Sequence, residues 1–175
     1  LESIQEGAKK PTEEVVLELT DEVYRLNRLV SDLQQLSLAE AGKLLLNKQS
    51  VELKPLIDRV CGYLQLLADE KKITLNYDRI PPECSLQLDA DRMTQVIVNL
   101  VGNALRHTPE QGIVEVIALE EDQAIIIRVR DTGQGIPEDV LPFIFDRFYK
   151  RDSARSRHEG GTGLGLSIAK GYVEA

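Results

Sequence analysis

Two asparagines spaced four residues apart, Asn99 and Asn103, are side chains that could bind a cation. They lie in the segment 90–107, whose apolar residues recur at helical spacing. At about 100° per residue, both asparagines share one side of this predicted helix with Gln95 and Arg106. Amide oxygens can ligate a hard cation, and an arginine can hold a phosphate. A plain solvated helix face would carry the same residue types, so the helix alone leaves both interpretations open.

A glycine-containing turn follows a predicted strand and reads Asp131-Thr-Gly133-Gln-Gly135-Ile136. Glycines two apart permit positive φ and let the backbone approach a planar or anionic ligand closely. The aspartate could accept a hydrogen bond from an exocyclic amine. Ordinary turns use the same residues, so this segment by itself is a weak signal.

A second glycine-rich segment reads Gly160-Gly161-Thr162-Gly163-Leu164-Gly165-Leu166 and runs into a helix that we expect to begin near Gly163. Backbone N–H groups at such a helix start form an anion site, because the helix dipole favours phosphate there. The segment is not a P-loop, since no Gly-Lys-Ser/Thr follows, and it lacks the strand that precedes a dinucleotide-binding turn. A loop without a ligand is the alternative.

An aromatic and basic stretch lies between the two glycine segments and reads Phe143-Ile-Phe145-Asp-Arg147-Phe148-Tyr149-Lys150-Arg151. Polar residues continue from there to Glu159. This composition predicts a mobile lid whose basic side chains cover phosphates. A packing turn followed by a disordered loop is the alternative interpretation.

In this order, the four motifs resemble the catalytic domain of histidine kinases. Asn-x-x-x-Asn, Asp-x-Gly-x-Gly, Phe-x-Arg-Phe-Tyr and Gly-x-Gly-x-Gly-Leu correspond to the N, G1, F and G2 boxes of that family. Residues 29–42, LVSDLQQLSLAEAG, are also similar to the end of the family's second dimerisation helix. The resemblance covers the chain almost end to end. It implies an α+β fold, a two-layer α/β sandwich of the histidine kinase, gyrase and chaperone ATPase type, preceded by a long dimerisation helix.

The resemblance also implies ligands for individual residues. Asn103 would ligate Mg²⁺, with Asn99 close to the same metal and phosphate groups, and Asp131 would contact the adenine amine. Gly133 and Gly135 would let the base lie against the backbone.

For the phosphates, Arg106 takes the place of a basic residue of the family, and His107 that of an aromatic residue near the nucleotide. Lys150 matches the basic residue that reaches the γ-phosphate, so Asn99, Arg106 and Lys150 are the expected catalytic residues. The full set expected to bind ATP is Asn99, Asn103, Arg106, His107, Asp131, Gly133, Gly135, Ile136, Phe148, Tyr149, Lys150, Gly161, Thr162, Gly163, Leu164, Gly165 and Leu166.

The chain has two histidines, and neither matches the family's phosphoacceptor motif, which resembles His-Glu/Asp-x-Arg/Lys-Thr-Pro. His107 belongs to the asparagine helix, and His158 is followed by Glu-Gly in the predicted lid. We therefore expect the acceptor helix to lie upstream of Leu1 and two further strands to follow Ala175, so that the chain would be a truncated fragment.

The remaining elements can be predicted from periodicity. Thr12 can cap a helix that we expect to run to about Leu46. Its apolar residues alternate three and four apart, as in helices that pack lengthwise on other helices; they are Val16, Leu19, Val23, Leu26, Val30 and Leu33. A dimer stem is therefore expected, with folding back onto its own domain as the alternative. On this division, residues 1–48 belong to the dimerisation domain and 49–175 to the ATP-binding domain.

Further expected elements are a short strand around Val51, a helix over about 54–71 and strands over 73–77, 86–88, 113–119 and 124–130. The last two strands form a hairpin turned by residues 120–123, with helices on one face of the sheet. Ile125, Ile127 and Val129 would face those helices. Without further strands after Ala175, the strand 124–130 would leave one sheet edge open.

Composition excludes several classes of protein. A formal net charge of −8 and a pI near 4.9 argue against nucleic-acid binding. Two cysteines are too few for a disulfide framework. No apolar run reaches the roughly 20 residues of a membrane span. Together with the resemblance, which implies a bacterial sensor, this leads us to expect the cytoplasmic domain of a sensor that is membrane-anchored only through other parts of the protein. The expected partners are a second copy, through the N-terminal helix, and a response-regulator receiver domain.

Two other functions fit the same fold. An ATP-hydrolysing switch of the gyrase or chaperone type would carry a glutamate in place of Asn99 to activate water, and an asparagine cannot accept that proton. A nucleotide-dead interaction module would not need four intact motifs. The predicted activity is transfer of the ATP γ-phosphate to a histidine on the acceptor helix, for relay to a response-regulator aspartate. The chain alone should bind Mg-ATP without phosphorylating itself.

Overall fold

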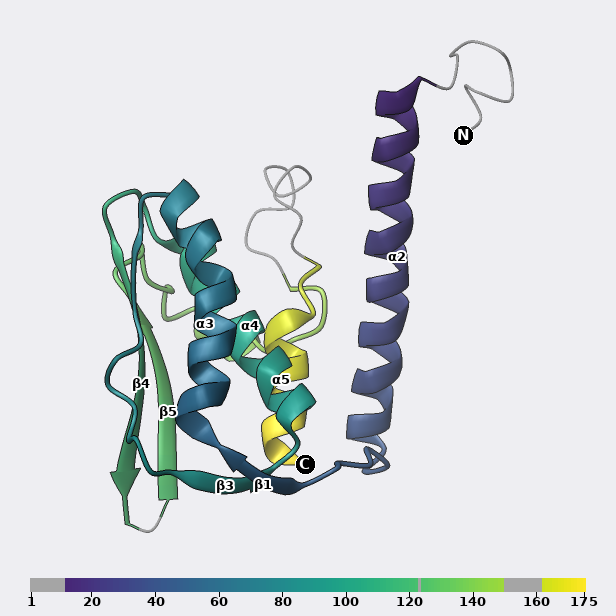
Figure 1. Ribbon diagram of the computed structural model, residues 1–175. Helices are drawn as coiled ribbons and strands as arrows, with labels where there is room; N and C mark the ends of the chain where they lie inside the picture. The colour runs from purple at the N-terminus through teal and green to yellow at the C-terminus, as the bar shows by residue number, and fades with distance from the viewer. Residues whose placement is uncertain (1–11, 123, 150–161) are drawn as a thin grey trace.

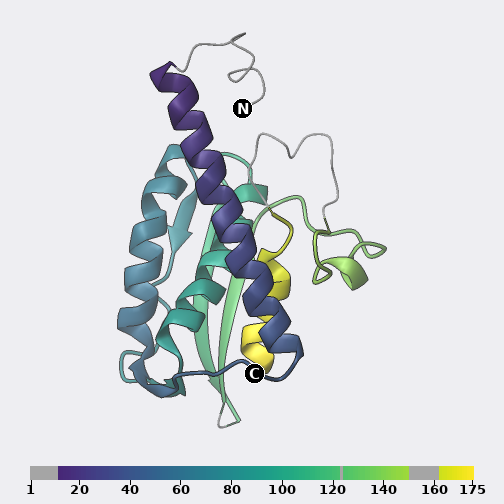
Figure 2. The same ribbon diagram turned by 90° about the vertical axis from the view of Figure 1, so that its right-hand side faces the viewer.

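The computed structural model describes residues 12–122, 124–149 and 162–175 of the chain (Figure 1). Its elements are α2 (Glu13–Glu40), β1 (Gln49–Glu52), α3 (Leu53–Glu70), β2 (Thr74–Asn76), β3 (Ser85–Leu88), α4 (Ala90–His107), β4 (Ile113–Glu121), β5 (Ala124–Asp131), η1 (Leu141–Phe143) and α5 (Gly165–Glu174). Helices α3, α4 and α5 lie on one face of the sheet that contains β4 and β5, and α2 stands beside α5 (Figures 1 and 2). The fold is α+β, with a layer of helices over a layer of strands, as predicted.

The strands form two small sheets. In one, β1 pairs antiparallel with β3; in the other, the strand order is β2-β4-β5, with β2 parallel and β5 antiparallel to β4. The hairpin is longer than predicted, because Glu120 and Glu121 pair with Ile125 and Ala124 instead of forming the turn. Among the described residues, β5 has a strand partner on one side only, so its other edge is unpaired.

The main core lies between the sheet and the inner faces of α3 and α4. Ile57, Val101 and Val114 are completely buried there. Ile125, Ile127 and Val129 of β5 pack against this core while Arg128 and Arg130 are exposed, as the alternation predicted. Burial of these apolar side chains is the main term that stabilises the fold, and it fixes α4 against the sheet.

Helix α2 begins where predicted and ends earlier. The Thr12 hydroxyl accepts the Val15 N–H at 3.4 Å, which caps the first turn. The prediction of a helix to Leu46 is wrong, because Gly42 adopts φ +62 after Glu40. The N–H groups of Gly42 and Lys43 then bond back to the carbonyls of Ala39 and Leu38, which is the hydrogen-bond pattern of a Schellman motif.

The apolar stripe of α2 is largely uncovered. Val16, Val23 and Val30 are 50%, 56% and 65% exposed. Near its C-terminal end, however, Leu36 is only 4% exposed and joins a second apolar cluster with α4 and α5. The helix therefore packs on its own domain at one end and leaves its predicted partner face open. Across the described ranges, no helix is both long and apolar enough to cross a membrane.

Candidate functional site

Helix α4 presents the asparagine stripe. Its start is fixed by Asp89, whose Oδ1 accepts the N–H groups of Asp91 and Arg92 at 3.1 Å each, while Oδ2 accepts the Asn47 N–H at 2.9 Å. Burial alone would raise the pKa of Asp89, but these bonds outweigh it and hold the pKa below its usual value. With its other side buried against the core, α4 holds Asn99 and Asn103 half-buried towards α5 and the loops.

Asn99 lies directly beneath the first residue of α5. A Cβ added to Gly165 would lie 3.4 Å from both Cγ and Oδ1 of Asn99. Within the part of the chain that the structure describes, Asn99 Nδ2 is the one buried side-chain nitrogen or oxygen without a hydrogen-bond partner. An unsatisfied buried donor costs about 1–3 kcal/mol, so this amide is poised for an acceptor that is not part of the described chain.

The N-terminus of α5 offers backbone donors beside that amide. Among the described residues, no side chain caps this helix, so its first-turn N–H groups can serve as donors for an anion. Thr162 fixes the approach to the helix, since its hydroxyl accepts the Leu164 N–H at 3.3 Å. Leu164 is fully buried in the second apolar cluster, which anchors the helix start, and Leu166 is half-buried.

The turn after β5 is fastened to both β5 and β4. Asp131 is exposed, and its Oδ1 accepts the Gly133 N–H at 2.8 Å. Thr132, which the sequence analysis did not single out, bonds twice to Ile113: its N–H donates to the carbonyl and its hydroxyl accepts the N–H. These bonds hold the aspartate at the end of the sheet nearest the last turn of α4.

The two glycines of this turn are required for different reasons. A Cβ on Gly133 would lie 2.6 Å from the carbonyl oxygen of His107, so the turn rests directly on the end of α4. Gly135 has φ +71, and apart from its chain neighbours no described residue has an atom within 4 Å of its missing Cβ. Gly133 therefore serves packing and Gly135 serves backbone conformation, while Ile136 beside them is 47% exposed.

The aromatic segment meets the second glycine segment at its base. Phe148 donates its N–H to the carbonyl of Gly163 at 3.0 Å, and both residues have positive φ, +59 and +74. A left-handed backbone conformation is strained for an aromatic residue, and strained residues are frequent at functional sites. Tyr149 stacks on Phe143 with ring centroids 6.0 Å apart. Residues 150–161, which include Lys150, Gly161 and most of the predicted lid, lie outside the described residues.

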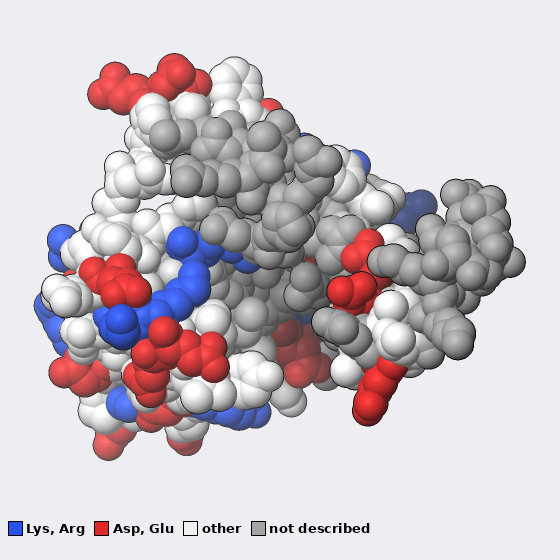
Figure 3. All heavy atoms as spheres, turned by 90° about the horizontal axis from the view of Figure 1, so that it is seen from above, with Lys and Arg blue, Asp and Glu red and all other residues white. Residues whose placement is uncertain are grey.

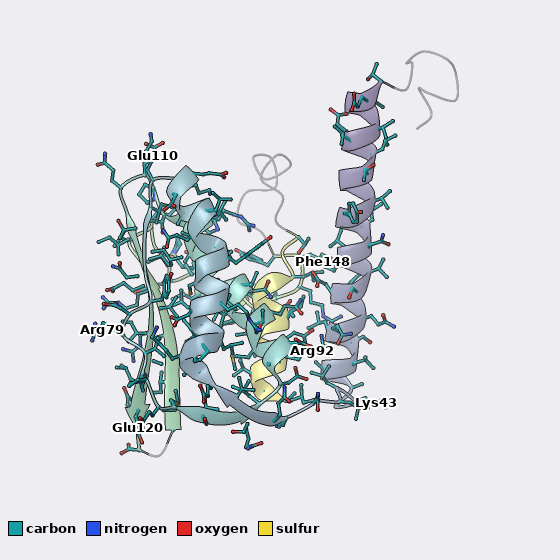
Figure 4. The ribbon with its side chains drawn as sticks, in the orientation of Figure 1. Lys43, Arg79, Arg92, Glu110, Glu120 and Phe148 are labelled. Atoms are coloured by element: carbon teal, nitrogen blue, oxygen red, sulfur yellow. The ribbon has the colours of Figure 1, made fainter. Side chains whose placement is uncertain are left out.

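The structure brings several of the predicted site residues into contact in two groups along α4. Asn99 meets Gly165, His107 meets Gly133, and Phe148 lies near the start of α5 (Figure 4). Arg106 is exposed in the last turn of α4. The view from above shows acidic and basic side chains interspersed on the surface (Figure 3).

A metal would depend on few protein ligands. Within the described ranges, no group of three His, Cys, Asp or Glu residues could hold a cation. The half-buried Asn103 amide could provide one oxygen, which fits Mg²⁺ because this ion keeps waters and takes ligands from substrate phosphates.

Gln95 does not take part in this site, although it shares the stripe. Its side chain instead contacts Tyr172 of α5 and Asp32 of α2. Burial raises the pKa of Tyr172, and the nearby Arg92 charge partly offsets that. Helical spacing alone could not separate Gln95 from the asparagines, because the helices that cover one end of the stripe come from distant sequence.

Comparison with known proteins assigns the domain. A family model described as histidine kinase-, DNA gyrase B- and HSP90-like ATPase matches residues 88–175, which include α4 and both glycine segments. The chain belongs to this ATPase family. The histidine kinase BaeS of Escherichia coli K12 is 36% identical to it over 175 residues, covering 100% of this chain and 37% of BaeS. The sensor kinase WalK of Bacillus subtilis is 36% identical over 186 residues, covering 100% of this chain and 29% of WalK. The chain thus spans about a third of the length of these relatives.

Solved structures of the family have the same fold. The histidine kinase AdeS of Acinetobacter baumannii superimposes with a TM-score of 0.81 at 26% identity, covering 99% of this chain and 79% of AdeS. Full-length ShkA, in complex with AMPPNP, superimposes with a TM-score of 0.76 at 27% identity, covering 95% of this chain and 35% of ShkA. Because AdeS covers nearly the whole chain, the likeness extends to α2 as well as to the ATPase domain.

Proposed function

We propose that this chain binds Mg-ATP between α4, the 131–136 turn and the start of α5, and transfers the γ-phosphate to a histidine. The observation that carries the proposal is the buried, unpartnered Nδ2 of Asn99 beside the uncapped N-terminus of α5. A phosphate oxygen there would accept from the amide and from backbone N–H groups at once. The AMPPNP bound by the structural relative ShkA supports a nucleotide as the ligand.

The base would lie at the other end of this site. One oxygen of Asp131 already holds the Gly133 N–H, and the second is the acceptor that we assign to the adenine amine. Gly135, with no atom of a described residue other than its chain neighbours within 4 Å of its missing Cβ, leaves room for a ring against the backbone. Ile136 is exposed beside it and can cover one edge of the base.

The phosphate end would contain the catalytic groups. Asn103 would contribute an oxygen to Mg²⁺, and Asn99, Arg106 and Lys150 would hold the transferring phosphate. When bound, Mg²⁺ neutralises charge on the phosphate oxygens. Phosphoryl transfer requires mainly positioning and electrostatic stabilisation, which amides, a guanidinium and helix N–H groups supply. Since Asn99 cannot act as the general base that hydrolysis of ATP would use, a histidine nucleophile fits the site better than water.

We infer that the acceptor histidine is neither of the two in this sequence. The main chain of His107 packs against Gly133, inside the proposed site, and His107 follows Asn103 by one helical turn. The relatives are named as signal-transduction and sensor kinases, which supports relay from the histidine to a response-regulator aspartate. The exposed stripe of α2 supports a homodimer, with residues 1–48 in the dimerisation domain and 49–175 in the ATP-binding domain.

A transfer assay tests this proposal. The chain is incubated with Mg-ATP labelled in the γ-phosphate, with and without a separate polypeptide that carries an acceptor histidine on a helix. We expect acid-labile label only on the added polypeptide. Asn103→Ala should abolish the transfer, whereas Asn76→Ala, at an exposed position of β2, should retain it. Stable label on His107 or His158, or equal transfer by Asn103→Ala, would contradict the assignment.

A further inference from the structure

Helix α2 has two distinct lateral faces. At about 100° per residue, Leu29, Asp32, Leu36 and Ala39 cluster around a direction roughly 130° away from the exposed apolar stripe. Leu29 and Leu36 join the second apolar cluster with residues of α4 and α5. The stripe therefore stays available for another helix while the face with Leu36 contacts the ATPase domain.

The contact with α5 is close. A Cβ on Gly171 would lie 3.3 Å from Ala39 Cβ and 3.9 Å from Leu36 Cδ1. Glycine at this position thus lets the two helices approach more closely than a larger residue would. The connector after α2 is also held, since the Asn47 N–H donates to Asp89 at the start of α4.

A chain of polar contacts joins α4, α5 and α2 at this interface. Arg92 Nη1 donates to the Tyr172 hydroxyl at 3.2 Å, and that hydroxyl donates to Gln95 Oε1 at 3.4 Å. Gln95 Nε2 in turn donates to Asp32 Oδ1 at 3.4 Å. The Arg92 guanidinium also lies over the Tyr172 ring, 5.2 Å from its centre, and near the C-terminal half of α5 (Figure 4). We call these four residues the stem latch.

The stem latch shares two of its three helices, α4 and α5, with the nucleotide site. Gln95 and Asn99 are one turn apart on α4, so the same stripe contacts the stem at one end and the ligand site at the other. Tyr172 and Gly165 lie on the single helix α5. The first residue of α5 packs against the Asn99 side chain, whose Nδ2 is buried, so a phosphate that enters to bond with Nδ2 would press on the start of α5.

We propose that the stem latch holds α5 over Asn99, so that docking of α2 and binding of nucleotide oppose each other. This inference rests on the proposed function. A short helix moves as one body, so a shift at Gly165 displaces Tyr172 and strains its contacts with Gln95 and Arg92. Coupling between two sites is reciprocal: opening the latch strengthens nucleotide binding by the same factor by which nucleotide weakens docking of α2. Typical couplings of this kind are about 5- to 150-fold.

Two latch variants with one matched control test the coupling. Tyr172→Phe removes the hydroxyl and keeps the ring, and Gln95→Met removes the amide and keeps the length of the side chain. The control is Gln65→Met on α3, which loses the same kind of contact, from Gln65 Nε2 to Asp69 at 2.7 Å, away from α2 and α5. Affinity for Mg-AMPPNP is measured by calorimetry, and exchange of amide hydrogens in residues 29–39 is measured with and without nucleotide.

We expect both latch variants to bind Mg-AMPPNP about fivefold more tightly or better, with faster exchange over 29–39, and Gln65→Met to behave as the parent. In the parent, Mg-AMPPNP should accelerate exchange over 29–39. Unchanged or weaker binding by both folded latch variants would overturn the proposal while leaving the nucleotide site intact. No binding by the parent would instead refute the proposed function and the coupling with it. Circular dichroism identifies a variant that has failed to fold, and the other variant then decides.

Discussion

Replacing Gly133 with alanine should destabilise the protein by forcing the 131–136 turn away from α4. The new Cβ would lie 2.6 Å from the His107 carbonyl oxygen and 2.6 Å from Asp131 Oδ1, where ordinary contact begins near 3.4 Å. The turn must therefore move by most of an ångström, and one of the two blocking atoms belongs to a helix backbone that cannot rotate away. Overpacking of this kind costs about 1–3 kcal/mol. For a chain of this length, a loss of about 2 kcal/mol lowers the melting temperature by roughly 4–8 °C.

Gly135 provides the matched comparison in the same turn. Its φ of +71 makes alanine strained by about 1–2 kcal/mol, but apart from its chain neighbours no described residue lies within 4 Å of the added carbon. Asparagine tolerates a left-handed backbone, so Gly135→Asn should melt closer to the parent than Gly135→Ala does. At Gly133 the order should reverse, because a larger side chain only worsens the clash. Thermal unfolding of the four variants measures this. Parent-like melting of Gly133→Ala, or recovery in Gly133→Asn, would refute the reasoning.

Three further results are expected. Asp131→Ala should weaken Mg-ATP binding by about 1–3 kcal/mol, measured by calorimetry. GTP should bind the parent poorly, because its keto group would face the carboxylate. If Asp131→Ala binds Mg-ATP as tightly as the parent, Asp131 does not contact the adenine amine. Burial, reinforced by the Asp58 charge, raises the pKa of the Cys61 thiol to about 11. The unfolded chain then releases that proton at lower pH than the folded chain, so the free energy of unfolding should fall as pH rises from about 9 to 11. The fall should be roughly 2–3 kcal/mol larger in the parent than in Cys61→Ala. Denaturant titrations measure it, and an equal dependence of the unfolding free energy on pH in both proteins would contradict this. Aspartate at Val23 and Val30, on the exposed stripe, should abolish self-association in sedimentation, and a parent that stays monomeric at high concentration would argue against the dimer stem.

The sequence predicted the elements that depend on local signals. Helix α4 occupies the expected 90–107, because its apolar face, its Asp89 cap and Thr108-Pro109 all act within a few residues. Strand β5 shows the predicted alternation for the same reason. The predicted end of α2 was wrong, because the apolar residues after Gly42 continue the helical spacing. The backbone conformation of Gly42 nevertheless ends the helix.

Contacts between distant segments could not be predicted in this way. Helical spacing placed Gln95 with the asparagines, yet α2 and α5 cover it, and those helices lie tens of residues away in sequence. The same holds for Gly133: the motif predicts a backbone that approaches a ligand, and the atom that fills the space of its missing Cβ is a carbonyl oxygen of α4. The sequence spacing does not show how the turn packs on the helix, so it cannot show which of the two glycines is required for packing.

One calorimetric titration tests whether α4 and the start of α5 form an Mg-ATP site. The parent and Asn103→Ala are titrated with AMPPNP, a hydrolysis-resistant nucleotide, with Mg²⁺ and with EDTA. We expect one site per chain, with Mg²⁺ strengthening binding to the parent and having little effect on Asn103→Ala. Absence of binding by the parent, or an undiminished effect of Mg²⁺ in Asn103→Ala, would contradict it.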